Sequence, residues 1–521
     1  MIGIAIGVVI GDASLSGIVA EDAEDAGDAG VAGGAGIRRP GDGEARRRPE
    51  DADIKGILFG DARRETMSLS SLVASLQSVV DIRNPVIQPA AVQSEVTGET
   101  LPTSTNPPLK LFLISTHFHQ TTGYAKVSHG LIGELAKLPW LSIVHYGIQG
   151  IQGLCSDRIY PSNVKVYDVL SLEKKRQDGF GFDEVGAAIE AEAPDLVLIY
   201  NDLGVICQYI DKLTPIRRKL SRPFQTWVYL DQVYCGQPPE LLETLNTNTD
   251  RMFCFTREWR DLLRSQGITR PIDVLAHGID SCVRHIPRRE ARAALKVPDD
   301  VFLFFSANRN QPRKRLDLLV MAFVELIVKH PQRQLFLMCL CDKGDKGGYP
   351  LFDIFARELA LRGVNPEHFA NRLMVTARDQ RFTDEEMNIF YSAADVGVSC
   401  AEGEGFGLCA FEQMSLGIPQ VLSDVVGHRE YCRPDGGILV KTSLRYYMPL
   451  CMTLLGGEAN AVSPSDFAAG MEQYVLHEDL RIAHGANAKK KVATYSWSCV
   501  TERFRRFLTI LREERALEAD A

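Results

Sequence analysis

Short runs of apolar residues recur along the chain from about residue 110 onward, and helix-like stretches separate them. Each run has the length of a buried strand. They occupy residues 111–115, 142–146, 195–200, 225–230, 252–255, 272–275, 301–307, 334–340, 372–377, 395–400 and 419–423. Strands that alternate with helices favour parallel sheets covered by helices on both faces. The pattern therefore predicts the α/β class.

The spacing of these runs divides the folded part into two similar α/β units. After the first series, the segment PRREARAALKV (287–297) reads as a helix that opens a second series. The junction lies near Ser281–Pro287. We therefore expect one domain over residues 109–285 and a second over residues 286–480.

Both ends of the chain differ from this pattern. Residues 1–108 are biased first to Ala, Gly, Asp and Arg, and then, over 83–108, to Pro, Thr, Ser and Asn. Such a composition cannot bury enough apolar surface to offset the entropy of ordering, which predicts a disordered tail and linker. At the other end, an amphipathic pattern from Asp479 to Glu518 predicts a closing helical segment over residues 481–521.

Composition excludes some classes of function. The 521 residues include 67 acidic and 58 basic side chains, which gives a net charge of −9. A non-specific nucleic-acid binder usually carries a basic excess, so we expect no nucleic-acid partner. No uncharged apolar stretch reaches the length of a membrane span. The 12 cysteines form no C-x-x-C pair and several lie in apolar runs, which favours a reduced cytoplasmic protein.

The loop SANRNQPRKRLDLLV (306–320) carries a cluster of cations directly after a predicted strand. Arg309, Arg313, Lys314 and Arg315 lie where this loop enters a helix. Cations beside a helix N-terminus are electrostatically unfavourable unless an anion joins them. Because ligands of parallel sheets bind at the carboxyl ends of strands, the loop predicts a site for two phosphates. A solvated charge cluster is the alternative.

A second loop, CAEGEGFGLCAFEQMSLGIPQV (400–421), combines glycines with acids after the predicted strand 395–400. Its glycines expose backbone N–H groups to a ligand. Glu404 in the loop and Glu412 on the next helix can face the same crevice. A carboxylate accepts a pair of hydroxyls well, as in a ribose or hexose diol. Capping of the helix by acids is the alternative.

Two further loops give weaker signals. In THFHQTTGYAKVS (116–128), Gly123 permits a tight turn and a close backbone approach to a ligand. His117 and His119 lie on the same loop, where a histidine is either a ligand contact or simply structural. His277, at the end of the first domain, faces the crevice if the two domains oppose each other.

Together these motifs resemble the retaining glycosyltransferases of family 4, which have the GT-B fold. The strongest match is Glu404-Gly-Phe-Gly-Leu-Cys-Ala-Phe-Glu412, which is similar to the family's Glu-x7-Glu signature. The resemblance runs from about Leu111 to Phe507. Further matches are Arg309 with Lys314, YSAADVGVS (391–399), SLGIPQV (415–421), HGID (277–280) and Trp497 in YSWSCV.

The resemblance implies two facing Rossmann-like domains, a C-terminal crossover helix and a nucleotide-sugar donor held mainly by the second domain. Arg309 and Lys314 would then hold the diphosphate. Glu412 would bind the ribose and Glu404 the donor sugar. The backbone of Phe406, Gly407 and Leu408 would hold sugar and phosphate, and Gly123 would approach the diphosphate from the first domain.

One segment departs from the family pattern. Many members carry a histidine at the end of the fourth strand of the first domain, whereas WVYLDQVY (227–234) places Asp231 in this region. Asp231 either replaces the histidine as a contact to the donor sugar or faces the acceptor. His277 is the other possible contact from this domain.

The same resemblance implies retaining chemistry by same-face attack, with the leaving phosphate taking the acceptor proton, so we name no protein nucleophile. Arg309, Lys314 and Glu404 are the expected catalytic residues. The Asp-x-Asp motif Asp51-Ala-Asp53 lies in the predicted tail, so we expect no metal and no cofactor besides the nucleotide-sugar substrate. The acceptor is a glycan, a lipid or a protein.

Two other functions fit the same residues. A nucleotide-sugar 2-epimerase of the same fold would isomerise or hydrolyse the donor without an acceptor. A catalytically inactive sugar-nucleotide-binding protein would bind the donor without turnover. Product analysis with and without acceptor separates these from a hexosyltransferase.

Overall fold

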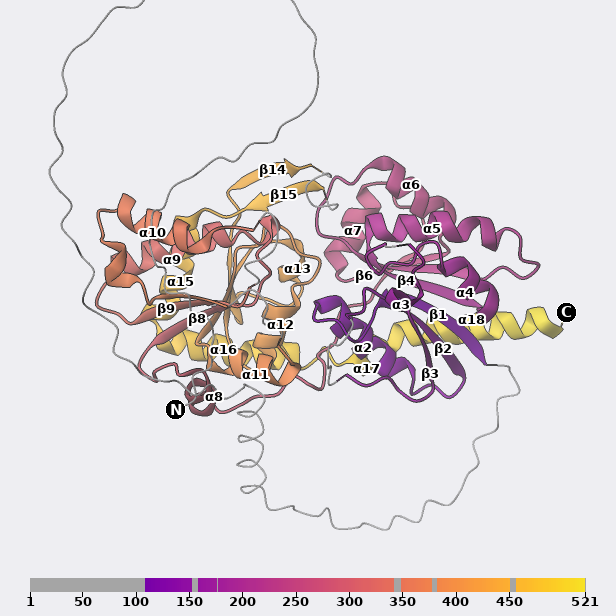
Figure 1. The fold of residues 1–521 in the computed structure, drawn as a ribbon, viewed down its shortest axis with the longest axis horizontal. Coiled ribbons are helices and arrows are strands. Elements are labelled where there is room, and N and C mark those ends of the chain that lie inside the picture. The colour runs from indigo at the N-terminus through magenta and orange to yellow at the C-terminus, as the bar shows by residue number, and fades with distance from the viewer. Residues whose placement is uncertain are drawn as a thin grey trace, which may run out of the picture.

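The computed structural model describes residues 108–151, 158–175, 177–341, 348–376, 382–449 and 456–520. The tail and linker predicted over residues 1–108 therefore lie outside the described residues, apart from the last position. Figure 1 shows the described part as two bodies side by side, the first in purple and magenta and the second in orange.

The first body is built on a seven-stranded parallel sheet in the order β3-β2-β1-β4-β5-β6-β7. Its strands are β1 (Leu109–Thr116), β2 (Leu141–Ile148), β3 (Val164–Asp168), β4 (Leu196–Asp202), β5 (Gln225–Asp231), β6 (Arg251–Cys254) and β7 (Ile272–Val274). Its helices are α2 (Gly123–Leu135), α3 (Val169–Leu172), α4 (Val185–Glu192), α5 (Leu203–Arg217), α6 (Pro239–Asn248) and α7 (Arg257–Ser265). The strand order reverses between β1 and β4, which is where ligands bind in such sheets.

The second body repeats this arrangement with a six-stranded parallel sheet in the order β10-β9-β8-β11-β12-β13. Its strands are β8 (Phe302–Ser306), β9 (Leu335–Cys339), β10 (Leu373–Val375), β11 (Val396–Ser399), β12 (Gln420–Ser423) and β13 (Gly437–Val440). Its helical segments are α8 (Arg288–Leu295), η1 (Pro312–Lys314), α9 (Leu316–Lys329), α10 (Leu351–Leu361), η2 (Pro366–Phe369), α11 (Asp384–Ala393), α12 (Leu408–Ser415), α13 (Val426–Arg429) and α15 (Pro464–Leu476). Both bodies are Rossmann-like, as expected.

Each apolar run named from the sequence coincides with one of these strands, and the bounds of run and strand differ by at most a few residues. Two strands of the parallel sheets were not predicted, and both lie at a sheet edge: β3 and β13. An edge strand buries less surface than a central one, so its sequence needs fewer apolar residues. The β3 sequence VKVYD is only partly buried, and its apolar signal is correspondingly weak.

A β-hairpin that the sequence did not predict joins the two bodies. It consists of β14 (Leu444–Met448) and β15 (Gly457–Ala461), which pair antiparallel. The N–H of Glu458 donates to the carbonyl of Cys235 at 2.8 Å, and the Gln237 side chain donates to the carbonyl of Gly456 at 3.0 Å. Figure 1 shows the hairpin along the top of the second body, with one end at the boundary to the first. The two hydrogen bonds link that end to the first body.

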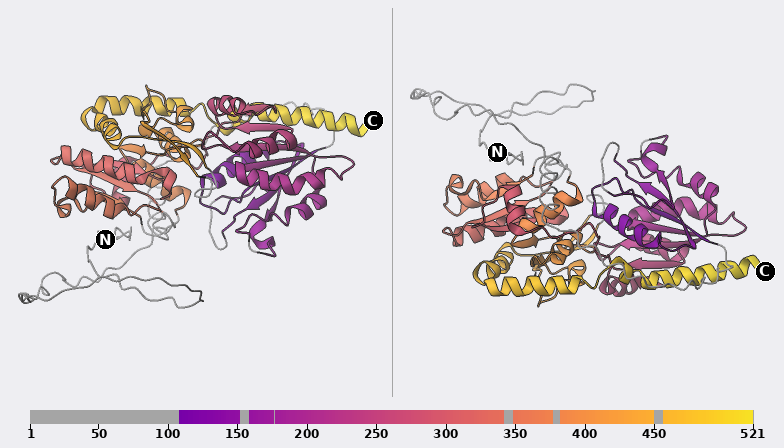
Figure 2. Two further views of the ribbon diagram at one scale, coloured as in Figure 1. Left: turned by 90° about the horizontal axis from the view of Figure 1, so that it is seen from above. Right: turned by 90° about the horizontal axis from the view of Figure 1, so that it is seen from below.

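The closing amphipathic segment forms three helices rather than one. α16 (Glu478–Val492) packs on α12 of the second body, whereas α17 (Trp497–Val500) packs on α2 and α18 (Glu502–Asp520) on β1 of the first. Figure 2 shows the yellow C-terminal helices passing from one body to the other. The chain therefore crosses back as expected. Among the described residues, none of the helices is both long enough and apolar enough to cross a membrane.

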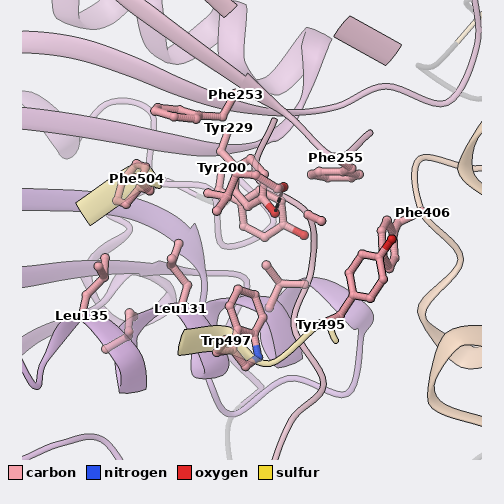
Figure 3. Packing of buried hydrophobic residues seen from close by; sticks show 14 of the residues in the cluster. Leu131, Leu135, Tyr200, Tyr229, Phe253, Phe255, Phe406, Tyr495, Trp497 and Phe504 are labelled. Carbon is pink, nitrogen blue, oxygen red and sulfur yellow. Dashed lines mark hydrogen bonds between the residues drawn. The ribbon is translucent and has the colours of Figure 1, made fainter. Parts of the chain in front are cut away.

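The crossing is fixed by an aromatic core that all these parts share. Trp497 and Phe504 from the C-terminal segment, Phe255 from the first body and Phe406 from the second belong to one buried cluster (Figure 3). Trp497 lies against Gly130 of α2 and Gly278: a Cβ at Gly130 would lie 2.0 Å from its Nε1. The crossover thus depends on glycine at these contacts.

We expect Gly130→Ala to destabilise the fold by about 1–3 kcal/mol, because the added methyl would overlap Trp497. Gly133→Ala on the same helix is the matched control, since a Cβ there meets nothing within 4 Å. Replacing a helical glycine by alanine in open space stabilises by roughly 0.5–1 kcal/mol. Chemical denaturation of both variants checks the prediction, and equal shifts in the free energy of unfolding would contradict it.

Candidate active site

Two adjoining cavities lie between the bodies, where the loops after β1, β8 and β11 meet. Their volumes are about 650 Å³ and 240 Å³. Every site residue expected from the sequence lines at least one of them. Gly123, Arg309 and Leu408 line both; Glu412 lines the larger; Asp231, His277, Lys314, Glu404, Phe406 and Gly407 line the smaller.

Glu404 is held by two cations in the smaller cavity. Lys314 Nζ pairs with its Oε1, and Arg313 Nη1 lies 3.2 Å from its Oε2. Burial opposes the charge on Glu404, but Lys314 and Arg313 outweigh burial and hold its pKa at about 2. The pKa of Lys314 is lowered by burial and by Arg313. The carboxylate stays ionised and shares these two cations with any anion that enters.

The four cations of the loop after β8 separate into two groups. Arg309, Arg313 and Lys314 line the smaller cavity. Arg313 is not part of the family match of Arg309 with Lys314, yet the structure places it beside Glu404. Arg313 and Lys314 are neighbours in the short η1 helix, and both side chains reach the carboxylate of Glu404. Arg315 lines neither cavity and its guanidinium binds Asp317 in a bidentate pair.

The loop after β11 brings backbone N–H groups to the same place. Gly407 has φ 91°, a left-handed conformation, and is the N-cap of α12. A Cβ at Gly407 would lie 2.7 Å from the Tyr431 hydroxyl, which donates to the Gly407 carbonyl at 2.9 Å. Glycine is required here by both conformation and space. The first N–H groups of α12 therefore face the cavities, where they favour an anion.

Glu412 is engaged from the opposite side of the cleft. Lys126 Nζ, from α2 of the first body, lies 2.8 and 2.7 Å from its two oxygens. Tyr391 donates to Oε2 at 2.8 Å. Lys126 is therefore paired with the carboxylate that, according to the family resemblance, binds the ribose hydroxyls.

A second ion pair lies beside the first. Arg158 of the first body makes two 2.8 Å hydrogen bonds to Asp384 of α11, and Lys126 Nζ is 3.7 Å from the same carboxylate. Burial opposes the charge on Asp384, yet Arg158 and Lys126 hold its pKa at about 2. Sequence reasoning missed Lys126, Arg158 and Asp384, because their pairing joins segments more than 200 residues apart.

Of the three histidines named from the sequence, one lines the smaller cavity and two line neither cavity. His277 is buried against Phe406, and its Nδ1 lies 2.8 Å from the Tyr229 hydroxyl. Burial lowers its pKa to about 3, so the ring is neutral at physiological pH. His117 and His119 line neither cavity. The N–H of His119 donates to His117 Nδ1 at 3.0 Å, which favours their structural interpretation.

Residues 299–445, which carry the loops of Arg309 and Glu404, match the family described as "Glycosyl transferases group 1". This segment belongs to that family. The group 1 domain so defined supplies Arg309, Lys314, Glu404 and Glu412, and the first body supplies Gly123, Asp231 and His277 from across the cleft.

Curated relatives of the chain include D-inositol 3-phosphate glycosyltransferases from several bacteria. The protein of Corynebacterium jeikeium is 29% identical over 218 residues, which is 41% of this chain and 44% of the relative. That of Kineococcus radiotolerans is 27% identical over 297 residues, 55% of this chain and 61% of the relative. The chain thus spans about half the length of the curated relatives it matches.

Solved structures share the fold over more of the chain. Sucrose-phosphate synthase from Thermosynechococcus elongatus aligns with a TM-score of 0.57 and 18% identity, over 79% of this chain and 100% of that one. HepE of Anabaena in complex with UDP and glucose aligns with a TM-score of 0.58 and 12% identity, over 77% of this chain and 99% of that one. The chain has the GT-B fold, as its motifs predicted.

Proposed function

We propose that this protein is a glycosyltransferase that moves a hexose from a nucleotide-sugar donor to an acceptor hydroxyl and retains the anomeric configuration. The observation that carries the proposal is the composition of the walls of the two adjoining cavities. Arg309, Lys314 and the first N–H groups of α12 supply positive charge, and Glu404 and Glu412 supply acceptors for hydroxyls. A sugar joined to a diphosphate needs both kinds of partner.

The proposed chemistry follows from where charge develops. Breaking the bond between sugar and phosphate builds negative charge on the leaving diphosphate and positive charge on the anomeric carbon. Fixed cations in a site that excludes water stabilise the diphosphate charge more strongly than they would in water. Lys314 and Arg309 are proposed for this role, and Glu404 is proposed to bind the sugar close to them.

A thermal-shift screen with UDP-, GDP- and ADP-hexoses tests donor binding, and UDP-glucose is the first probe because HepE has been solved with it. Turnover is then measured with an acceptor panel that begins with inositol 3-phosphate, the acceptor in the names of the curated relatives. The anomeric configuration of the product, read by NMR, tests retention. Product formed without acceptor would favour a 2-epimerase, and binding without turnover an inactive sugar-nucleotide-binding protein.

We also propose that catalysis needs no metal ion, because Lys314 and Arg309 supply the charge that a divalent cation supplies in other transferases. Turnover is expected to continue in EDTA at an unchanged rate. The measurement compares kcat before and after chelation and after re-addition of Mg²⁺ or Mn²⁺. Loss of turnover in EDTA that either ion restores would contradict the proposal.

A cytoplasmic location is part of the same proposal. The described cysteines are free thiols, and several are buried, including Cys254, Cys339 and Cys400. Free thiols of this kind are typical of a reducing compartment. Fractionation of cells that express the full chain tests the location.

A further inference from the structure

Two aspartates end neighbouring strands of the first sheet at the cleft. β4 ends at Asp202 and β5 at Asp231, and the two residues are paired in register. Tyr124 of α2 lies between them: its hydroxyl is 2.6 Å from Asp202 Oδ1 and 2.7 Å from Asp231 Oδ2. We call these three residues the carboxyl–tyrosine trio.

The distances set the number of protons in the trio. A tyrosine hydroxyl has one hydrogen and can donate to one carboxylate only. The second short contact is attractive only if that carboxyl is protonated and donates to the phenol oxygen. The trio therefore holds one proton in addition to the phenol's own, and its net charge is −1. Consistently, burial and the neighbouring Asp202 raise the pKa of Asp231 to about 7.

One carboxylate oxygen of the trio has no hydrogen-bond partner and lies at the boundary between the two bodies. Asp231 Oδ1 is buried and has no hydrogen-bond partner. A Cβ on Gly405, in the loop after β11, would lie 1.9 Å from this oxygen, so the oxygen faces the second body across the cleft. Tyr124 and Asp231 both line the smaller cavity with Lys314 and Glu404. The charge of the trio therefore acts on any anion that enters this cavity.

We propose that Tyr124 and Asp202 share one proton with Asp231, and that these two positioning residues keep the trio singly charged so that the cavity admits the anionic donor. The inference rests on the proposed function, since it takes the bound molecule to be a nucleotide sugar. It adds a pH limit to donor binding that arises in the first body.

The charge of the trio matters because the donor brings a diphosphate into the same cleft. Above the pKa of Asp231 the extra proton goes to solvent and the trio carries two negative charges. Tyr124 then satisfies only one carboxylate, and the other repels the diphosphate. Besides one another, the carboxyls of the trio face Tyr124, Tyr200, Tyr229, Arg309, Arg313 and Glu404. Arg313 and Glu404 are already paired with each other, so the carboxyls of the trio are the groups that change charge near neutrality.

The sign of the pH effect follows directly. A raised pKa means that the protonated form is present below pH 7 and is lost as the pH rises through 7. If only the protonated trio binds the donor, affinity falls by up to about thirtyfold between pH 6 and pH 8.5. A nucleotide sugar is a suitable probe, because both of its phosphates are diesters and do not titrate in this range.

The test has two readouts on the full chain. Difference infrared spectroscopy without ligand follows the protonated carboxyl, and calorimetry measures UDP-glucose affinity, or that of whichever nucleotide sugar the wild type binds, from pH 6 to pH 8.5. We expect a protonated carboxyl that titrates near pH 7 and an affinity that falls over the same range. Asp202→Asn removes the like charge, so the carboxyl band and the pH dependence of affinity are both expected to disappear. Asp183→Asn, at an exposed aspartate paired with Lys212, is the matched control and should change neither.

Each outcome separates the trio from the proposed function. Affinity that rises with pH, or an unchanged pH profile in Asp202→Asn, overturns the inference while leaving a glycosyltransferase intact. Absence of the carboxyl band in the wild type at pH 6 overturns it as well. If the band titrates as expected but no nucleotide sugar binds at any pH, the shared proton is real, and both the proposed function and the pH limit on donor binding fail.

Discussion

Lys314→Ala and Arg309→Ala are each expected to lower kcat by about 10²–10³, with a smaller change in KM. Charge on the diphosphate grows as the bond to the sugar breaks, so these cations help the transition state more than the bound donor. The double variant is expected to fall short of the product of the single effects, because both residues serve one group. Steady-state kinetics with donor and acceptor at saturation provide the measurement.

Arg315→Ala is the matched control in this loop, because Arg315 lines neither cavity and binds Asp317. Arg313→Ala is not a control, since Arg313 lies beside Glu404 and is expected to lower kcat as well. Circular dichroism and melting temperature confirm that each variant is folded. A near-wild-type kcat in folded Lys314→Ala and Arg309→Ala would contradict a catalytic role of the loop. Equal, small effects on kcat from replacing each of the four cations of the loop would contradict it as well.

Glu412→Ala is expected to weaken the binding of both the nucleotide sugar and the free nucleoside diphosphate by roughly ten- to a hundredfold. The proposed partner is the ribose, which both ligands contain, and a hydrogen bond to a charged group contributes about 1.5–3 kcal/mol. The ligand must take this carboxylate from Lys126, which holds both of its oxygens in the structure. Calorimetric titration with UDP and UDP-glucose measures the two affinities.

Glu404→Ala is the variant with which Glu412→Ala is compared, because it separates binding of the sugar from binding of the nucleotide. Glu404 is proposed to contact the sugar, so its loss should penalise UDP-glucose and spare UDP. Identical behaviour of the two variants would show that the division of roles between Glu404 and Glu412 is wrong. Both variants need a stability measurement, because each leaves a buried lysine, Lys314 or Lys126, without its carboxylate partner.

The sequence was most informative where a strand is buried on both faces. Central strands such as β1 and β4 must be almost continuously apolar, because helices cover both sides of the sheet, and this leaves a clear pattern. The edge strands β3 and β13 and the β14–β15 hairpin were not predicted, whereas the short edge strands β7 and β10 were. The amphipathic pattern at the C-terminus indicated helix correctly, but the breaks near Thr494 and Thr501 did not emerge from it.

Local patterns in the sequence also predicted where a ligand should bind. In parallel sheets, ligands bind at the carboxyl ends of strands, so unusual loops after predicted strands indicated the place. Glycines, acids and cations in those loops further indicated the kind of ligand. Gly407 and three cations of the loop after β8, Arg309, Arg313 and Lys314, line the cavities, and the family motifs predicted the GT-B fold.

The partners of these residues depended on contacts between segments far apart in the chain. Nothing near Glu412 in sequence indicates Lys126, and nothing near Asp231 indicates that Tyr124 would join it to Asp202. Such pairs arise when two separately folded bodies meet, and their energies depend on distance and burial rather than on spacing along the chain. Local periodicity was therefore sufficient to predict the central strands and the class of fold, and it indicated the loops that line the cavities. The ion pairs and the protonation of the cavity walls were decided by how the two bodies pack together.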